Sequence, residues 1–162
     1  MKIHSCLLAF GLALPSVAWA HGEAHGGPKA AAPTSADQHP WGRQGDPKQA
    51  TRTVRVTMSD AMRFDPSQLT LKRGETVTFV VHNAGRLMHE FVIGTPAALD
   101  EHAQMMKKHP GMEHDEPYMA HVAPGRTQRI SWTFSESGDF LAGCLVAGHW
   151  DAGMKAQLRV KE

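Results

Sequence analysis

The chain has 162 residues with 17 basic and 16 acidic side chains, so its formal net charge at pH 7 is +1. This balance argues against nucleic acid or an anionic membrane surface as a partner, since both attract strongly basic proteins. The length suits one domain with a modest core and a tail.

Residues 1–20 have the organisation of a secretory signal peptide. A basic residue precedes an apolar stretch over residues 7–14, and the segment ends in small residues at Ala20. The apolar stretch is too short to span a bilayer as a helix. Cys6 precedes this stretch instead of following it, which does not fit a lipoprotein. We therefore expect a mature chain that begins at His21 and is periplasmic, without membrane insertion.

Export determines how the remaining cysteine is interpreted. Loss of residues 1–20 removes one lysine and Cys6, which leaves 16 basic and 16 acidic residues and one thiol, Cys144. An unpaired thiol in an oxidising compartment is prone to oxidation or dimerisation unless it is buried or bound to metal. Cys144 is therefore a candidate metal ligand.

Residues 21–50 are rich in Gly, Pro and Ala and contain almost no large apolar side chains. Such a composition cannot bury enough surface to offset the entropy lost on ordering. We therefore expect a flexible N-terminal tail over residues 21–50 and one folded domain over residues 51–162.

Short segments of alternating polar and apolar residues dominate the domain. Alternation with a period of two is typical of half-buried strands. The expected strands cover residues 51–58, 67–71, 76–82, 89–93, 129–134, 138–143 and 156–160. They predict an all-β fold, an antiparallel β-sandwich. Residues 96–109 lack this alternation and contain helix formers after a proline, which predicts a helix inserted between strands.

The segment GCLVAGHWDAGM, residues 143–154, contains Cys144, His149 and Met154 with four residues between each neighbouring pair. This spacing fits a loop that folds three side chains round one point, whereas a helix would scatter them. Two histidines, one cysteine and a weak axial methionine form a type 1 copper site. A second histidine is therefore required, and His89 is the first choice, with His82 as the competitor.

Each of these residues also has an ordinary structural interpretation. A lone cysteine is often a small buried hydrophobe, and a methionine often fills a core. The joint spacing and the β-sandwich pattern favour the copper site instead. Zinc fits less well, because methionine is a poor zinc ligand and no second cysteine remains.

The pattern Cys-x4-His-x4-Met after an upstream His-Glu-Phe, on strands that follow MRFDPSQLTLKRGETVTF, resembles the cupredoxins, such as plastocyanin, azurin and rusticyanin. The loop spacing is most similar to rusticyanin, and the resemblance covers Thr51–Glu162. It implies a Greek-key β-sandwich with one type 1 copper, whose ligands would be His89, Cys144, His149 and Met154. One position departs from the family: Glu90 stands where plastocyanin and azurin have an asparagine, so their reduction potentials cannot be carried over.

Residues 102–121 form a second region rich in metal donors, with half of the eight methionines that remain after cleavage. The donors are His102, Met105, Met106, His109, Met112, His114, Met119 and His121. On the expected helix the first four would share one face. This face could pack on the sandwich as ordinary core. Because thioethers suit Cu(I) and imidazoles suit Cu(II), we hypothesise an additional labile copper site here.

The expected new N-terminus is a further candidate. His21 would offer an α-amine and an imidazole to Cu(II), which resembles the histidine brace of copper oxygenases and periplasmic copper carriers. His25 and His39 lie on the same segment. A solvated tail that binds no metal is the competing interpretation.

Two functions follow from these sites. The first is a periplasmic copper-tolerance protein that handles copper and can exchange one electron between Cu(II) and Cu(I). The second is a dedicated electron-transfer protein that shuttles electrons between periplasmic partners. The His/Met-rich insertion favours the first, with copper ions and a redox partner, copper exporter or oxidase as partners. Copper nitrite reductases and multicopper oxidases resemble two or more such domains, so this single domain is predicted not to be an enzyme.

Overall fold

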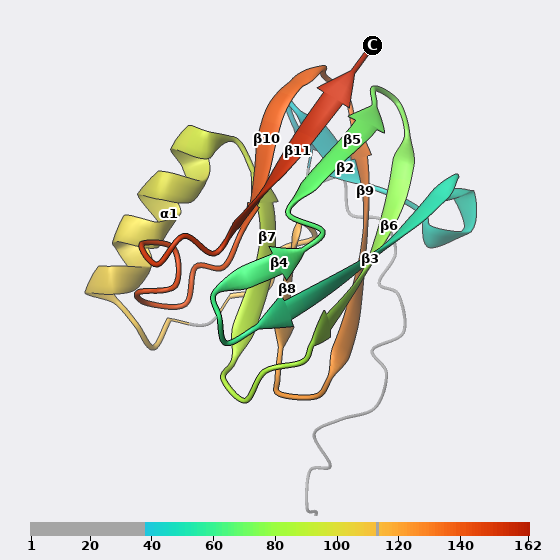
Figure 1. The fold of residues 1–162 in the computed structure, drawn as a ribbon. Coiled ribbons are helices and arrows are strands. Elements are labelled where there is room, and N and C mark those ends of the chain that lie inside the picture. Colours follow the sequence, from blue (N-terminus) through green and yellow to red (C-terminus); the bar gives the residue numbers. More distant parts are fainter. Residues whose placement is uncertain (1–37, 113) are drawn as a thin grey trace, which may run out of the picture. The chain divides into compact units, whose positions relative to one another are not determined.

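Two β-sheets packed face to face form the domain in the computed structural model, which describes residues 38–112 and 114–162 (Figure 1). The first sheet has the strand order β1 (Gln38–His39), β2 (Gly42–Gln44), β9 (Thr127–Phe134), β6 (Thr76–Asn83), β3 (Arg52–Ser59) and β4 (Arg63–Asp65). The second has the order β5 (Gln68–Lys72), β11 (Lys155–Lys161), β10 (Gly138–Gly143), β7 (His89–Gly94) and β8 (Met119–Val122). This is the β-sandwich that the sequence predicts.

Apolar side chains that alternate along the strands form the core between the sheets. In β3, Val54, Val56 and Met58 are buried, while the residues between them are exposed. The same alternation recurs along β11. The bulky rings of Trp132 and Phe79 are fully buried between the sheets. Burial of this apolar surface is the main force that holds the two sheets together.

Two strand pairs run parallel, β3 with β6 and β5 with β11, so the antiparallel prediction is wrong for these pairs. The chain leaves the first sheet after β4, adds β5 to the second sheet and returns in β6. Such a crossover lets neighbouring strands of one sheet run in the same direction. The short strands β1, β2, β4 and β8 were not predicted from the sequence.

Residues 38–50 are part of the folded domain, so the predicted tail over residues 21–50 is wrong for this segment. Strand β2 pairs with β9, and a short 3-10 helix, η1 (Pro47–Gln49), follows. Trp41 is 8% exposed and lies against Trp132, with ring centroids 4.8 Å apart. A buried tryptophan removes a large apolar area from water, which anchors a segment of otherwise polar composition. The predicted signal peptide and the remaining part of the tail lie outside the described residues.

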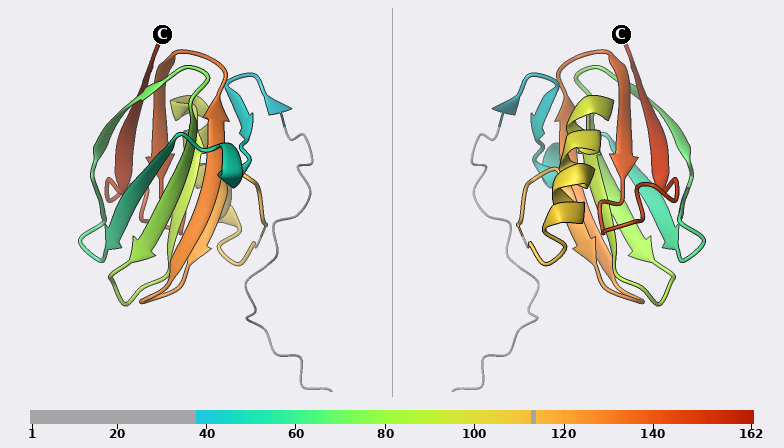
Figure 2. Two further views of the ribbon diagram at one scale, coloured as in Figure 1. Left: turned by 90° about the vertical axis from the view of Figure 1, so that its right-hand side faces the viewer. Right: turned by 90° about the vertical axis from the view of Figure 1, so that its left-hand side faces the viewer.

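The helix α1 (Pro96–Lys108) follows β7, where the sequence predicts it. The Thr95 side chain accepts a hydrogen bond from the backbone N–H of Ala98 at 3.3 Å and caps the helix. Figure 2 shows α1 against the outer face of the second sheet, beside β7 and β10. The helix buries Leu99, Ala103 and Met106 there. Among the described residues, no helix combines the length and the apolar character needed to cross a membrane.

Candidate metal centre

The hairpin of β10 and β11 builds one end of the candidate site. Its last residue pair is Gly143 with Lys155, so Cys144 and Met154 directly flank the loop that joins the strands. The Cys144 N–H donates to the Met154 carbonyl at 3.1 Å, and the Met154 N–H donates to the His149 carbonyl at 3.1 Å. These bonds fold the eleven-position segment 144–154 back on itself and hold the three predicted donors on one short loop.

The ring of Trp150 closes this loop against the hairpin. A Cβ at Gly143 would lie 2.5 Å from Cζ3 of Trp150, so only glycine allows the indole to approach this closely. Trp150 is 5% exposed and its Nε1–H donates to Asp100 of α1 at 3.2 Å. The Nζ atom of Lys155 lies over the Trp150 ring, 3.7 Å from its centroid. Helix α1 therefore helps to fix the loop.

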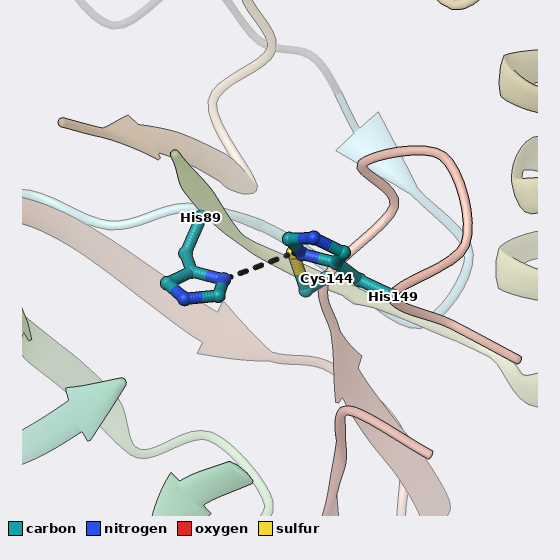
Figure 3. A group of neighbouring side chains, drawn as sticks. All are labelled: His89, Cys144 and His149. Atoms are coloured by element: carbon teal, nitrogen blue, oxygen red, sulfur yellow. Dashed lines mark hydrogen bonds between the residues drawn. The ribbon is translucent and has the colours of Figure 1, made fainter. Parts of the chain in front are cut away.

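Three donor side chains converge at this end of the sandwich (Figure 3). The Cys144 Sγ lies 3.3 Å from His149 Nδ1 and 3.9 Å from His89 Nδ1. All three donor atoms lie within 4.8 Å of one another. His89 and Cys144 are fully buried, whereas His149 is half-buried. Such convergence of a thiol and two imidazoles is the arrangement that a type 1 copper site requires.

Met154 is fully buried in the same core cluster as Cys144, and its carbonyl accepts from the Cys144 N–H. His82 lies elsewhere. The Nδ1 of His82 pairs with the Thr127 hydroxyl at 3.1 Å on the first sheet. His82 is not in the group of convergent donors, so His89 is the second histidine of this cluster. Cysteine, two histidines and an adjacent buried methionine form a soft to borderline donor set, which fits copper.

Asp60 orients the ring of His89, a role that the sequence analysis missed. Its Oδ1 lies 3.1 Å from His89 Nε2. Because a carboxylate only accepts, His89 donates its Nε2–H, and the Nδ1 lone pair faces Cys144. Asp60 also accepts the backbone N–H groups of Arg86 at 2.8 Å and Leu87 at 3.2 Å. These backbone hydrogen bonds, the one from Arg86 above all, lower the pKa of the Asp60 carboxyl.

Burial controls the protonation of the donors. Removal from water raises the pKa of the Cys144 thiol to about 12, although the Glu90 N–H donates to its sulfur at 3.3 Å. The metal-free protein therefore carries a thiol at neutral pH, and a bound cation is needed to form the thiolate. Burial also lowers the pKa of His149, and the nearby His89 acts in the same direction. His149 is thus a neutral imidazole, the form that binds metal.

The second predicted region divides into three parts. Met106 and Met119 are buried in a core cluster beneath α1, where they pack with apolar neighbours such as Leu145. Met105 and Met112 are 42% and 40% exposed, and His109 is exposed at the end of α1. Three histidines, His102, His114 and His121, come together.

The spacing of His102, Met105, Met106 and His109 puts them on one side of the helix, but this side is only partly buried and does not bring the four donors together. Adjacent residues on a helix point about 100° apart, and Met106 faces the core whereas Met105 faces outward. Spacing along the helix could not identify which side packs on the sheet. The other candidate, His21, lies outside the described residues.

Comparisons with known proteins identify copper-binding relatives. A family model described as copper binding proteins of the plastocyanin/azurin family matches residues 50–161. The copper-resistant cuproprotein CopI of Rubrivivax gelatinosus is 50% identical over 141 residues, which cover 87% of this chain and 83% of that protein. The copper-resistant cuproprotein CopI of Pseudomonas aeruginosa is 32% identical over 171 residues, with 88% and 85% covered.

Solved structures share the fold. Reduced auracyanin from Roseiflexus castenholzii has a TM-score of 0.60 at 20% identity, and the match covers 70% of this chain and 99% of auracyanin. An azurin from Methylomonas sp. strain J has a TM-score of 0.56 at 14% identity, and the match covers 70% of this chain and 100% of azurin. At these identities the likeness concerns the sandwich fold.

Proposed function

Because the chain belongs to the plastocyanin/azurin family of copper-binding proteins, we propose that it binds copper in a type 1 site and acts in periplasmic copper tolerance. The proposed ligands are His89, Cys144, His149 and Met154. The observation that carries this assignment is the approach of Cys144 Sγ to the Nδ1 atoms of both histidines, at 3.3 and 3.9 Å. The ligands lie on β7 and on the β10–β11 loop, so the strands of one sheet position all four.

We also propose one-electron redox capability, supported by the same arrangement. When bound, copper would supply the Cu(II)/Cu(I) couple. The buried His89 is held by Asp60, and the loop that carries the other donors is closed by its own backbone hydrogen bonds. Donors that are fixed in this way need little rearrangement when the charge of the metal changes. The half-buried His149 is the proposed route for the electron to a partner.

The copper-tolerance role is supported by the relatives, which are named copper-resistant cuproproteins and are similar over most of both chains. The partners we propose are copper ions together with a redox partner protein, a copper exporter or an oxidase. We propose a binding protein and not an enzyme, in line with the names of these relatives. Periplasmic location is proposed from the signal-like organisation of residues 1–20. A dedicated electron-transfer role remains the second candidate, supported by the fold that auracyanin shares.

Complementation tests the tolerance role. A host that lacks its own copy of the gene is grown over a range of copper concentrations with the wild-type protein, with Cys144→Ala or with the control His82→Gln. His82 lies outside the donor cluster, so the control should restore growth. Cys144→Ala should not restore it. Full copper tolerance with Cys144→Ala, at equal protein level, would contradict the proposal.

A further inference from the structure

Three histidines from three different segments meet beside α1. His102 lies on α1, His114 lies in the loop that follows, and His121 lies on β8. The ring centroids of His102 and His114 are 4.7 Å apart, and those of His114 and His121 are 6.5 Å apart. Three half-buried imidazoles at such distances repel one another when protonated. Their grouping therefore calls for an interaction that offsets this repulsion.

Two ring nitrogens in this group are buried without a hydrogen-bond partner among the described residues. They are Nε2 of His102 and Nδ1 of His114. Buried polar atoms in folded proteins are nearly always paired, and an unpaired one carries the cost of its lost hydration. Burial, followed by the charge of His114, lowers the pKa of His102. Neither nitrogen is occupied by a protein partner, so each can offer its lone pair to a metal in the matching tautomer.

The third histidine is held by a buried carboxylate. The Nδ1 of His121 lies 3.2 Å from Oε1 of Glu90, and its Nε2 donates to the His114 carbonyl at 2.8 Å. Glu90 is 5% exposed. A carboxylate that accepts from one nitrogen of an imidazole is the usual partner of a metal-binding histidine, because it directs the other nitrogen to the metal. That other nitrogen, Nε2, already lies beside His114.

We infer that His102, His114 and His121 form a second metal site, which binds Cu(II) through His102 Nε2, His114 Nδ1 and His121 Nε2. Among the described residues only the donors of the first site already lie within 4.8 Å of one another, so these three rings would turn toward the bound ion. His121 would release its Nε2 proton to solvent and exchange its bond to the His114 carbonyl for the metal, and Glu90 would keep the ring in place. The oxidised ion is chosen because the donors are imidazoles: the buried methionines of this region, Met106 and Met119, pack in the apolar cluster. Imidazole suits Cu(II), which binds such sites more tightly than Zn(II) does.

Carboxylates around the cluster favour a cation. Glu90 acts on both His102 and His121, and Glu116 and Asp115 act on these histidines as well. Glu90 also joins the two copper sites. Its side chain holds His121, while its backbone N–H donates to Cys144 Sγ at 3.3 Å and its neighbour in the chain is His89. Occupancy of the second site should therefore perturb the visible spectrum of the first.

Cu(II) binding to the Cys144→Ala protein tests this inference independently of the first site. Bound copper per chain is measured by equilibrium dialysis against buffered Cu(II), and nitrogen coordination by electron paramagnetic resonance. His102→Gln or His114→Gln is then added to Cys144→Ala. Either change alone should abolish binding of the same single Cu(II), together with its imidazole nitrogen couplings in the resonance spectrum. Glu90→Gln should weaken binding at this site by about 10–100-fold. The matched control is His109→Gln, since His109 is exposed nearby, and it should change nothing. Any copper bound by the N-terminal segment is the same in all these proteins, so it does not affect the differences between them.

A second measurement uses the protein with Cys144 intact. There, His102→Gln with His114→Gln should lower total bound copper by one ion and keep an intense thiolate-to-copper absorption band, which should no longer shift as further copper is added. Circular dichroism and the unfolding midpoint confirm that each variant is folded. Equal copper stoichiometry and affinity in Cys144→Ala with and without the two histidine changes would overturn the second site. Displacement of the bound Cu(II) by an equal concentration of Zn(II) would overturn its assignment to copper.

Discussion

The carboxylate of Asp60 fixes the His89 ring in the proposed copper site, and its removal is expected to weaken copper binding. In Asp60→Ala, His89 Nε2–H loses an acceptor at 3.1 Å, and the backbone N–H groups of Arg86 and Leu87 lose theirs at 2.8 and 3.2 Å. Loss of a partner that orients a metal-bound imidazole costs about 10–100-fold in metal affinity. We expect the Kd of the first site for Cu(II) to rise by that factor.

Asp60→Asn is the matched control, because the two carboxylate oxygens have different partners. Oδ1 contacts His89 and Leu87, whereas Oδ2 accepts from Arg86. An amide with its oxygen in the Oδ1 position keeps the first two contacts and loses the third. The expected loss of affinity is therefore smaller, below about tenfold.

Competition with a copper chelator, followed at the thiolate-to-copper absorption band, gives the three affinities. The unfolding midpoints of the metal-free proteins show whether the variants retain the fold. If wild type, Asp60→Asn and Asp60→Ala bind copper equally tightly with the same band, Asp60 does not have the role assigned to it.

Three further predictions concern the metal-free protein. Burial raises the pKa of Cys144 to about 12 from the ordinary thiol value of 9.0, so native protein at pH 8 should react with iodoacetamide at least about a hundredfold more slowly than unfolded protein. Equal rates, followed by mass spectrometry, would contradict this. Glu90 raises the pKa of His121 to about 9 from 6.5. The stabilisation is thus complete below about pH 6.5 and is lost as the pH rises through about 9, by about 1 kcal/mol after solvent screening. Denaturant unfolding of wild type should show this decline, and His121→Gln should flatten it; parallel curves would refute the coupling. Trp41→Ala should lower the free energy of unfolding by about 3 kcal/mol, whereas a change below about 0.5 kcal/mol would mean that residues 38–50 do not stabilise the domain.

The sequence was informative where a pattern is local. Alternation in β3 and β11 follows directly from which side chains face the core, and the spacing of Cys144, His149 and Met154 is set by a single loop. Both could therefore be predicted from neighbouring residues.

Features that depend on distant residues could not be predicted. Asp60 lies 29 residues before His89, and no spacing rule connects an acid in a turn with a histidine that begins another strand. Trp41 lies in a segment whose average composition is polar, which gave no sign that its ring packs on Trp132 where β2 pairs with β9. Which donors of residues 102–121 meet depends on how α1 sits on the sheet. This packing separates His102 from Met105 and joins it to His114.

A Cu(II) titration tests whether Cys144, with His89 and His149, holds a type 1 copper. The visible spectrum and total bound copper are recorded for the wild-type protein and for Cys144→Ala. We predict an intense thiolate-to-copper band that saturates at one Cu(II) per chain in the wild type and is absent from Cys144→Ala. A wild-type protein without this band, or a variant that retains it, would contradict the assignment.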